Sequence, residues 1–260
     1  MGEKFNEDAY EQVLISLFEK LGYEYECGYD VERDYSEPYY RDDLEASIRR
    51  LNPQYDNSVI EEGIRNITNF ELASMEEKNE KVTLWMQGGM EVNYQEGGET
   101  KTVLLKLVDY TNLNNNRFKV VNQWRVEGEQ TKRCDMVVML NGLPIVVVEL
   151  KSAISEGADI HDAYMQIRNY QQAIPSMFNY NAFNVISDMT ETKAGTITAK
   201  ETRYMEWKSE NGDYQSTMLA DYQTFYRGIF KKEHLLDILQ NFICFDKKQG
   251  NVKKIMAAYH

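Results

Sequence analysis

The sequence predicts an α/β (α+β) protein with a mixed central β-sheet flanked by helices. Apolar residues spaced three and four apart predict helices through much of the first 88 residues and again at 160–173. Between these segments, apolar residues either alternate with polar ones or form short continuous runs, which is typical of strands. Helices and strands mixed in this way along one chain favour helices packed on a sheet.

The first helix is predicted at 7–21, with Asn6 as a cap and Gly22 at its end. Its apolar residues recur at i, i+3, i+4 and i+7 and are Leu14, Leu17, Phe18 and Leu21. Glu7 and Glu11 lie one turn apart on a neighbouring face. Their spacing alone is typical of solvated carboxylates near the positive end of a helix, so it favours no catalytic role.

The following elements alternate in type along the chain. Residues 22–41 have no clean period, and we interpret them as an ordered excursion or long loop. A helical layer in front of the sheet is predicted from 42–51, 56–68 and about 71–86. The predicted strands are a hairpin within 90–107 across Gly97–Gly98, then 117–126, 136–140, 145–148, 185–186 and a possible edge hairpin at 196–207. The tail shows helical patterns at 235–239 and, more weakly, at 252–259.

Composition narrows the possible functions. The net charge of −13 argues against a surface coated with phosphate-binding lysines, so tight binding to DNA needs a local basic patch, other domains or other subunits. The three cysteines and three histidines lack metal-ligand spacing, which favours free thiols in a reducing compartment. Apolar runs are too short for a membrane span, and the N-terminus is too acidic for a secretory signal. We therefore expect a cytoplasmic protein with no membrane partner.

The stretch 132–151 contains three ionisable residues in an otherwise apolar background. Asp135 begins one predicted strand, and Glu149 and Lys151 end the next. Such charges are also found where a strand simply reaches the surface, but they suit a metal-dependent phosphodiester-cleaving site. Mg²⁺ prefers oxygen ligands, which Asp135, Glu149 and the backbone carbonyl of Leu150 would supply. Lys151 lies on the same strand face as Glu149 and would orient the water or neutralise the phosphate.

This hypothesis requires a particular pairing register in the hairpin that joins the two strands. Asn141–Gly142 is a strong signal for a two-residue turn. With that turn and a regular ladder, residue 134 would pair with Glu149, and Asp135 would point to the other face. A shared metal therefore predicts either a three-residue loop at 141–143 or a β-bulge that brings Asp135 opposite Glu149.

Beyond spacing, Asp135 with Glu149-Leu150-Lys151 resembles the PD-(D/E)xK nuclease motif. The surrounding sequence resembles the N-terminal nuclease domain of the restriction (R) subunit of type I restriction–modification enzymes, HsdR. The matching segments are 108–110, 114–118, 120–124, 140–144, 166–170, 174–175, 185–188 and 195–199. Cys134 stands where the motif usually has Pro, a residue that does no chemistry. The resemblance implies a PD-(D/E)xK restriction-endonuclease-like fold, Mg²⁺ (or Mn²⁺) as cofactor, double-stranded DNA as substrate, and methylase and specificity subunits as partners.

The resemblance also assigns roles outside the central stretch. Gln166 and Tyr170 lie at i, i+4 on the predicted helix and match the family's QxxxY element. By spacing alone they are an amide and a phenol on a helix surface; the resemblance implies that they lie beside the metal and contact DNA or couple the nuclease to its motor. The family's nuclease fold begins with a helix whose Glu approaches the metal, and we prefer Glu11 over Glu7 for this role.

The resemblance divides the chain into an endonuclease domain at 1–210 and a helical extension at 211–260. The domain has a helical part at 1–88 and a sheet-bearing part at 89–210. The chain carries no GxxxxGK[S/T] motif, so we expect a nuclease-domain fragment whose ATP-driven translocase domains are absent. A catalytically silent nuclease-like domain that docks the motor onto partner subunits is the alternative. A small-molecule enzyme has neither a Gly-rich loop nor a nucleophile–His pair to support it.

Overall fold

The computed structural model describes residues 7–151, 160–188, 190–209, 221–248 and 251–257. Its centre is a six-stranded sheet with the order β1-β4-β5-β6-β7-β8. The strands are β1 (Glu24–Cys27), β4 (Phe118–Glu127), β5 (Thr131–Leu140), β6 (Leu143–Leu150), β7 (Phe183–Ser187) and β8 (Thr192–Gly195). The β1–β4 and β6–β7 pairs are parallel and the other neighbours antiparallel, so the predicted mixed sheet is confirmed.

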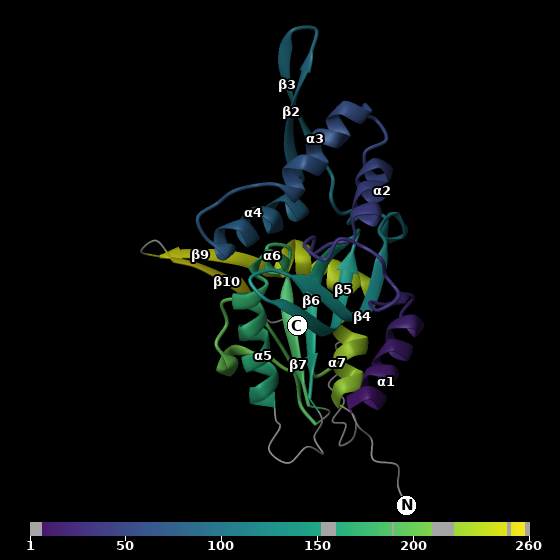
Figure 1. Cartoon of the computed structure of the whole chain (residues 1–260), viewed down its shortest axis with the longest axis vertical. Helices are drawn as coiled ribbons and strands as arrows, with labels where there is room; N and C mark the ends of the chain where they lie inside the picture. Colours follow the sequence, from purple (N-terminus) through teal and green to yellow (C-terminus); the bar gives the residue numbers. More distant parts are fainter. Residues whose placement is uncertain (1–6, 152–159, 189, 210–220, 249–250, 258–260) are drawn as a thin grey trace, which may run out of the picture.

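Helices cover both faces of this sheet (Figure 1). One face packs against α1 (Glu7–Lys20) and α7 (Asp221–Ile229), whose Phe18 and Tyr226 belong to the larger apolar cluster. The other face packs against α5 (Ile160–Ala173) and α6 (Pro175–Phe178) in a second cluster. Because both faces are covered, all eight residues of β6 are buried.

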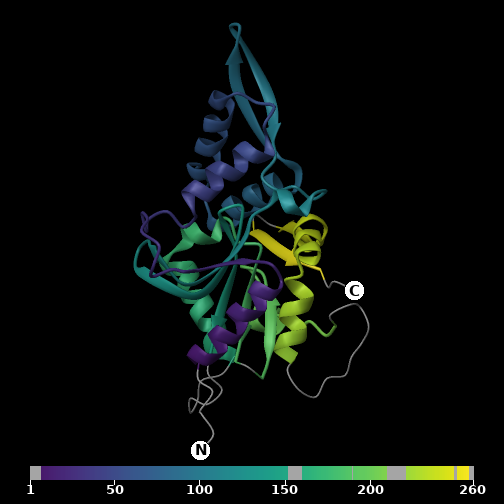
Figure 2. The ribbon, with the colours of Figure 1, turned by 90° about the vertical axis from the view of Figure 1, so that its right-hand side faces the viewer.

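A second layer lies beyond one end of the sheet, at the top of Figures 1 and 2. It contains α2 (Arg41–Leu51), α3 (Asn57–Thr68), α4 (Met75–Gly88) and the hairpin of β2 (Met90–Glu96) and β3 (Glu99–Leu105). The hairpin across Gly97–Gly98 is confirmed and forms a separate two-stranded sheet that projects from the molecule. The three helices were expected in front of the main sheet, and they lie at its end instead.

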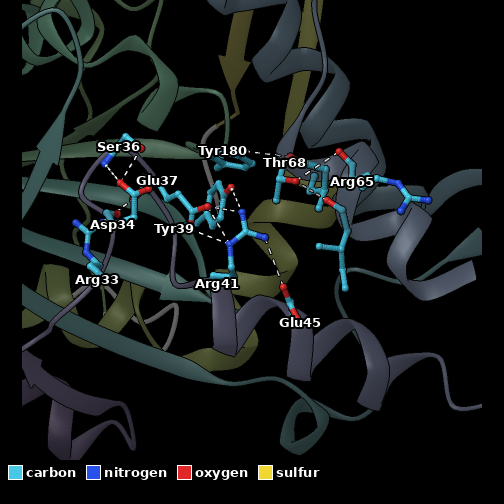
Figure 3. Close-up of polar contacts among 12 residues, drawn as sticks. Arg33, Asp34, Ser36, Glu37, Tyr39, Arg41, Glu45, Arg65, Thr68 and Tyr180 are labelled. Atoms are coloured by element: carbon cyan, nitrogen blue, oxygen red, sulfur yellow. Dashed lines mark hydrogen bonds and ion pairs between the residues drawn. The ribbon is translucent and has the colours of Figure 1, made fainter. Parts of the chain in front are cut away.

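The predicted excursion at 22–41 is ordered but contains a strand that the sequence did not reveal. β1 has the sequence Glu-Tyr-Glu-Cys, and its residues are half-buried or exposed, so it lacks an apolar signal. After it, Asp34 Oδ1 accepts from Ser36 N at 2.9 Å, and Arg41 pairs with Glu37. Figure 3 shows these contacts from the excursion to the start of α2.

Two strand and helix predictions near the C-terminal end are wrong. The 196–207 region is not a hairpin: after β8 it forms the short turn η2 (Glu201–Arg203), and its backbone joins the sheet through the single bridge of Ala194 with Met205. The expected helix at 252–259 is wrong over the described residues, which form β10 (Asn251–Met256) paired with β9 (Ile243–Lys248), while 258 and 259 lie outside the described residues. The buried position of β10 is taken by Lys254, so the strand alternation was hidden in the sequence.

The segment after residue 220 is helical only in part. It begins with α7, α8 (Lys232–Asp237) and the π-helical turn η3 (Ile238–Phe242), and then enters the β9–β10 hairpin. Phe225, Tyr226 and Phe230 belong to the same apolar cluster as α1. The described part of this segment therefore shares its core with the sheet, while residues 210–220 lie outside the described residues.

Candidate active site

The hairpin of β5 and β6 has the shifted register that a shared site requires. Its turn is the tight one, because Leu140 pairs with Leu143 across Asn141 and Gly142, whose φ angles are 52° and 86°. The register then shifts between Val138 and Met139, and Ile145 is left without a partner in the ladder. Beyond this bulge Met136 pairs with Val148, which brings Asp135 opposite Glu149. The bulge form of the prediction is confirmed, and the three-residue loop is not formed.

Buried contacts hold this turn. Asn141 Oδ1 accepts from Arg117 N at 2.8 Å, while its Nδ2 donates to Leu107 O and Asn116 Oδ1, both at 2.9 Å. The carbonyl of Gly142 accepts from Tyr40 N at 2.9 Å, just before α2. The turn that starts the register is therefore anchored from three neighbouring segments.

A second irregularity lies across from Asp135, in β4. The β4–β5 ladder is regular on both sides of Gln123 and Asp135 but omits that pair, and Gln123 has a φ of 52°. Met136 packs in the larger apolar cluster, yet Cys134 packs in the second one, where strict alternation would not put it. The alternation of β5 thus breaks at Asp135. A left-handed φ at a residue other than glycine is characteristic of functional sites.

Glu149 and Lys151 are in direct contact, and Asp135 contacts the backbone of Leu150 between them. Asp135 Oδ2 accepts from Leu150 N at 2.8 Å, which fixes this carboxylate beside β6. Lys151 Nζ donates to Glu149 Oε1 at 2.5 Å and to the carbonyl of Leu150 at 3.0 Å. The ammonium therefore rests on two of the oxygens that we expect to bind metal.

Burial and crowding of like charges change the proton affinity of this pair. Burial, and then the charge of Asp135, raise the pKa of Glu149 to about 8. Burial also raises the pKa of Asp135. Burial alone would lower the pKa of Lys151, but the neighbouring Glu149 carboxylate outweighs it and raises that pKa. In the absence of a metal, Glu149 therefore holds near neutral pH a proton that an exposed glutamate would have released.

Tyr170 reaches this pair from α5. Its hydroxyl lies 2.9 Å from Glu149 Oε2 and 2.9 Å from the carbonyl of Arg133. A phenol has one proton, so when it donates to the carbonyl it accepts from Glu149, which suits a protonated Glu149. Gln166, one turn earlier, reaches the Tyr170 hydroxyl. Tyr170 of the QxxxY element therefore contacts a carboxylate of the site, and Gln166 contacts Tyr170.

Both candidate glutamates of α1 are electrostatically coupled to Asp135. Glu11 is 9% exposed and accepts from Asn122 Nδ2 at 2.7 Å and from Gln123 Nε2 at 2.9 Å. Burial, with a further effect of Asp135, raises the pKa of Glu7 and also that of Glu11. The Lys151 ammonium has the opposite effect on Glu7, because it favours the charged carboxylate and so lowers the pKa. The structure thus brings both residues near the site, and the preference for Glu11 stays a prediction.

A cavity of about 410 Å³ opens beside these residues. Its lining contains three cations and no carboxylate: Gly28, Tyr29, Tyr35, Gln123, Arg125, Thr131, Lys132, Arg133, Gln166 and Tyr170. The sequence did not single out Tyr29, Tyr35 or the cations. The signal available was a group of basic residues around the β4–β5 turn of an acidic chain.

The donor set suits a small, hard cation. Within the described residues no three His, Cys, Asp or Glu side chains gather around one point. Mg²⁺ does not need such a group, because it retains several waters and takes one or two carboxylates. Asp135, Glu149 and the Leu150 carbonyl provide oxygen ligands of the required kind. Burial, and then the charge of Asp135, raise the pKa of Glu149, and a bound cation would offset both effects.

A mixed sheet that presents an acid on one strand and Glu149-Leu150-Lys151 at the end of the next defines a nuclease-like α/β fold. The family model described as type I restriction enzyme R protein N terminus matches residues 4–203, and the chain belongs to this family. Within the described residues, no helix has both the length and the apolar character needed to cross a membrane.

Curated relatives match most of the chain. It is 31% identical over 269 residues to the type I restriction enzyme HindI endonuclease subunit of Haemophilus influenzae, covering 98% of this chain and 26% of that protein. It is 30% identical over 285 residues to the putative type I restriction enzyme MjaIXP endonuclease subunit of Methanocaldococcus jannaschii, covering 99% and 27%. The chain thus spans about a quarter of the length of these relatives.

Proposed function

We propose that this chain is the Mg²⁺-dependent endonuclease domain of a type I restriction enzyme R subunit and hydrolyses phosphodiester bonds of double-stranded DNA. The observation that carries the proposal is the bulged register, in which the positions that follow the Met136–Val148 pair are Asp135 and Glu149, with Lys151 on the Glu149 carboxylate. A plain hairpin would bury the same valines without making this site. ATP-driven translocation, and assembly with methylase and specificity subunits, would belong to the rest of the enzyme.

The residues of the chain divide the chemistry between them. Asp135, Glu149 and the carbonyl of Leu150 would hold the cation, and Leu150 N keeps Asp135 in place for this role. A bound Mg²⁺ supplies Lewis-acid stabilisation of the charge that develops on the phosphate and acidifies the attacking water. When Lys151 leaves Glu149, its ammonium faces the same region and would neutralise a phosphate oxygen or orient the water. Tyr170 would keep the Glu149 carboxylate in position.

Cleavage by the assembled complex tests the proposal. Asp135→Asn, Glu149→Gln and Lys151→Ala are each expected to reduce plasmid cutting at least about 100-fold, the usual effect of removing a group that stabilises transition-state charge. ATP hydrolysis and translocation should continue. Glu91→Gln is the matched control, since Glu91 is an exposed carboxylate of β2. Retained cutting by all three site variants would refute a catalytic role.

Calorimetry with Mn²⁺ separates a nuclease from a silent docking domain. The unaltered chain should bind the ion, and Asp135→Asn should lose most of that binding. Lys151→Ala should bind at least as tightly, because the ammonium that rests on Glu149 Oε1 and the Leu150 carbonyl is gone. A chain that binds no Mn²⁺ at pH 8 would instead favour the docking function.

A further inference from the structure

The cavity beside the carboxylates has a charge opposite to that of the molecule. The chain carries a net charge of −13, yet Arg125, Lys132 and Arg133 line this cavity and no acidic residue does. Arg125 is paired with Glu127 at 2.7 Å, so Lys132 and Arg133 carry the argument. Its position is set by the β4–β5 turn on one side and by the excursion after β1 on the other. A local positive surface of this kind is what a phosphate chain needs on an acidic protein.

Aromatic rings accompany these cations. The Arg133 guanidinium lies 4.9 Å from the centre of the Tyr29 ring and donates to the Tyr29 hydroxyl. The Arg125 guanidinium lies 4.5 Å from the centre of the Tyr35 ring. Tyr29 is 64% exposed, which leaves ring surface for a ligand. Binding sites for unpaired nucleic acid strands usually combine cations that follow the phosphate backbone with aromatic rings on which bases stack.

The cavity shares a wall with the proposed catalytic site. Tyr170 lines the cavity and contacts Glu149, while Gln123 lines it and donates to Glu11. A strand whose phosphate lies at Asp135 and Glu149 would therefore send its next nucleotide into the cavity. About 410 Å³ is within the range of small-ligand pockets. A cavity of this size takes a ligand about as large as one nucleotide and does not hold a base-paired duplex.

We infer that this cavity holds one unstacked nucleotide of a DNA strand, with its base on Tyr29 and its phosphate at Arg133 and Lys132. The placement beside a scissile phosphate rests on the proposed function, whereas binding of the nucleotide does not. The inferred consequence is that the site engages a locally opened strand during cutting.

Fluorescence anisotropy with a labelled oligothymidylate tests this inference. The 260-residue chain is titrated in EDTA, so cleavage plays no part, at several salt concentrations. Arg133→Ala should reduce the slope of log Kd against log salt by about 0.7, the value for one lost phosphate contact on a single strand. Arg65→Ala, which removes an exposed arginine of α3 paired with Glu62, should leave the slope unchanged.

The aromatic part has its own test. Tyr29→Ala should weaken binding about five- to 150-fold, the size of one base–aromatic stack, without changing the salt slope. Tyr29→Phe should restore most of that loss. An abasic oligonucleotide of equal charge should bind the unaltered chain as weakly as oligothymidylate binds Tyr29→Ala.

Several results would overturn the inference: no binding at the lowest salt, equal binding of the abasic strand, tighter binding of a duplex than of the single strand, or variants that all behave like Arg65→Ala. Such a failure would leave the proposed function standing if Asp135→Asn still abolished cutting by the complex. Conversely, single-strand binding with the expected variants would survive even if Asp135→Asn cut normally.

Discussion

Glu149 is a buried carboxylate whose environment favours its protonated form. It is 2% exposed, and its contacts are the Lys151 ammonium and the Tyr170 hydroxyl. One ammonium does not neutralise both Glu149 and Asp135, so the protein holds a proton that an exposed glutamate would release. The buried charge is tolerated because protonation or a cation neutralises it.

The stability of the metal-free protein should therefore fall as pH rises. The pKa of Glu149 is about 8 in the folded protein and ordinarily 4.5, so between these values the folded state binds a proton that the unfolded state does not. We expect Glu149 to lower the free energy of unfolding by up to about 1.4 kcal/mol per pH unit across this range. Urea unfolding in EDTA at pH 6, 7 and 8 measures it.

Glu149→Gln should remove this contribution and make the protein more stable at pH 8, while Glu91→Gln should keep the original pH dependence. Added Mg²⁺ should reduce the loss of stability at high pH, because a cation replaces the proton. An unfolding free energy that rises from pH 6 to pH 8 equally in the unaltered chain and in Glu149→Gln would contradict the raised pKa.

At this scale the sequence predicted Asp135, Glu149 and Lys151 mainly through the resemblance to the nuclease motif, because their spacing alone is a weak signal. It did not predict Tyr29 or Arg133 as neighbours. They are far apart along the chain, and Tyr29 belongs to an excursion without periodicity, so only the folded chain brings them together. Likewise, Glu7 and Glu11 both approach Asp135, and helix periodicity alone could not separate them.

Among the elements, the β5–β6 hairpin has the most constrained turn. A Cβ on Gly142 would lie 2.5 Å from Leu44 N and 2.7 Å from Tyr40 O, and the φ of 86° is already unfavourable for an L residue. Gly97 in the β2–β3 turn has a φ of 62° with nothing within 4 Å of the same atom. The two glycines thus differ in the space around them.

We expect Gly142→Ala to destabilise the protein by about 3 kcal/mol, from the left-handed backbone and the overpacking together. Gly97→Ala should cost only about 1 kcal/mol, since the backbone term remains alone. Urea unfolding of both variants at pH 6 provides the comparison. Equal losses would show that the packing around Gly142 yields easily and that the turn is not rigidly anchored.

The hairpin also shows where element prediction succeeds and fails. Asn141–Gly142 predicted the turn, and the demand of a shared site predicted the offset, but the sequence did not indicate that Ile145 is the residue left out. β1 was missed because a four-residue edge strand needs no apolar pattern. β10 was missed because its inward residue is a lysine.

That lysine connects the C-terminal hairpin to the rest of the molecule. Lys254 Nζ donates to Asn79 Oδ1 at 2.9 Å, Thr83 Oγ1 at 3.2 Å and Asn181 O at 2.6 Å. Burial holds the pKa of Lys254 well below its usual range. The family model ends at residue 203, but the packing of the molecule continues beyond it.

A chain ended at residue 210 should therefore fail to fold. It would lose Phe225, Tyr226 and Phe230 from the core, and each large aromatic core side chain contributes about 3–5 kcal/mol. Their sum approaches the whole stability of a typical domain, about 5–15 kcal/mol. We expect circular dichroism to show no cooperative urea transition for the shortened chain. A transition matching that of the 260-residue chain would instead support an independent domain at 1–210.

The bulge at Ile145 has a consequence for folding itself. Every residue of β6 is buried and both faces of the sheet are apolar, so a strand that slides by one position would still cover nearly the same hydrophobic surface. Such a misaligned chain would be compact and nearly as well packed, but its two acids would point apart. The tight turn at Asn141–Gly142 is compatible with both registers, so the bulge at Ile145 distinguishes the competent fold from an inert one that hydrophobic burial alone cannot reject.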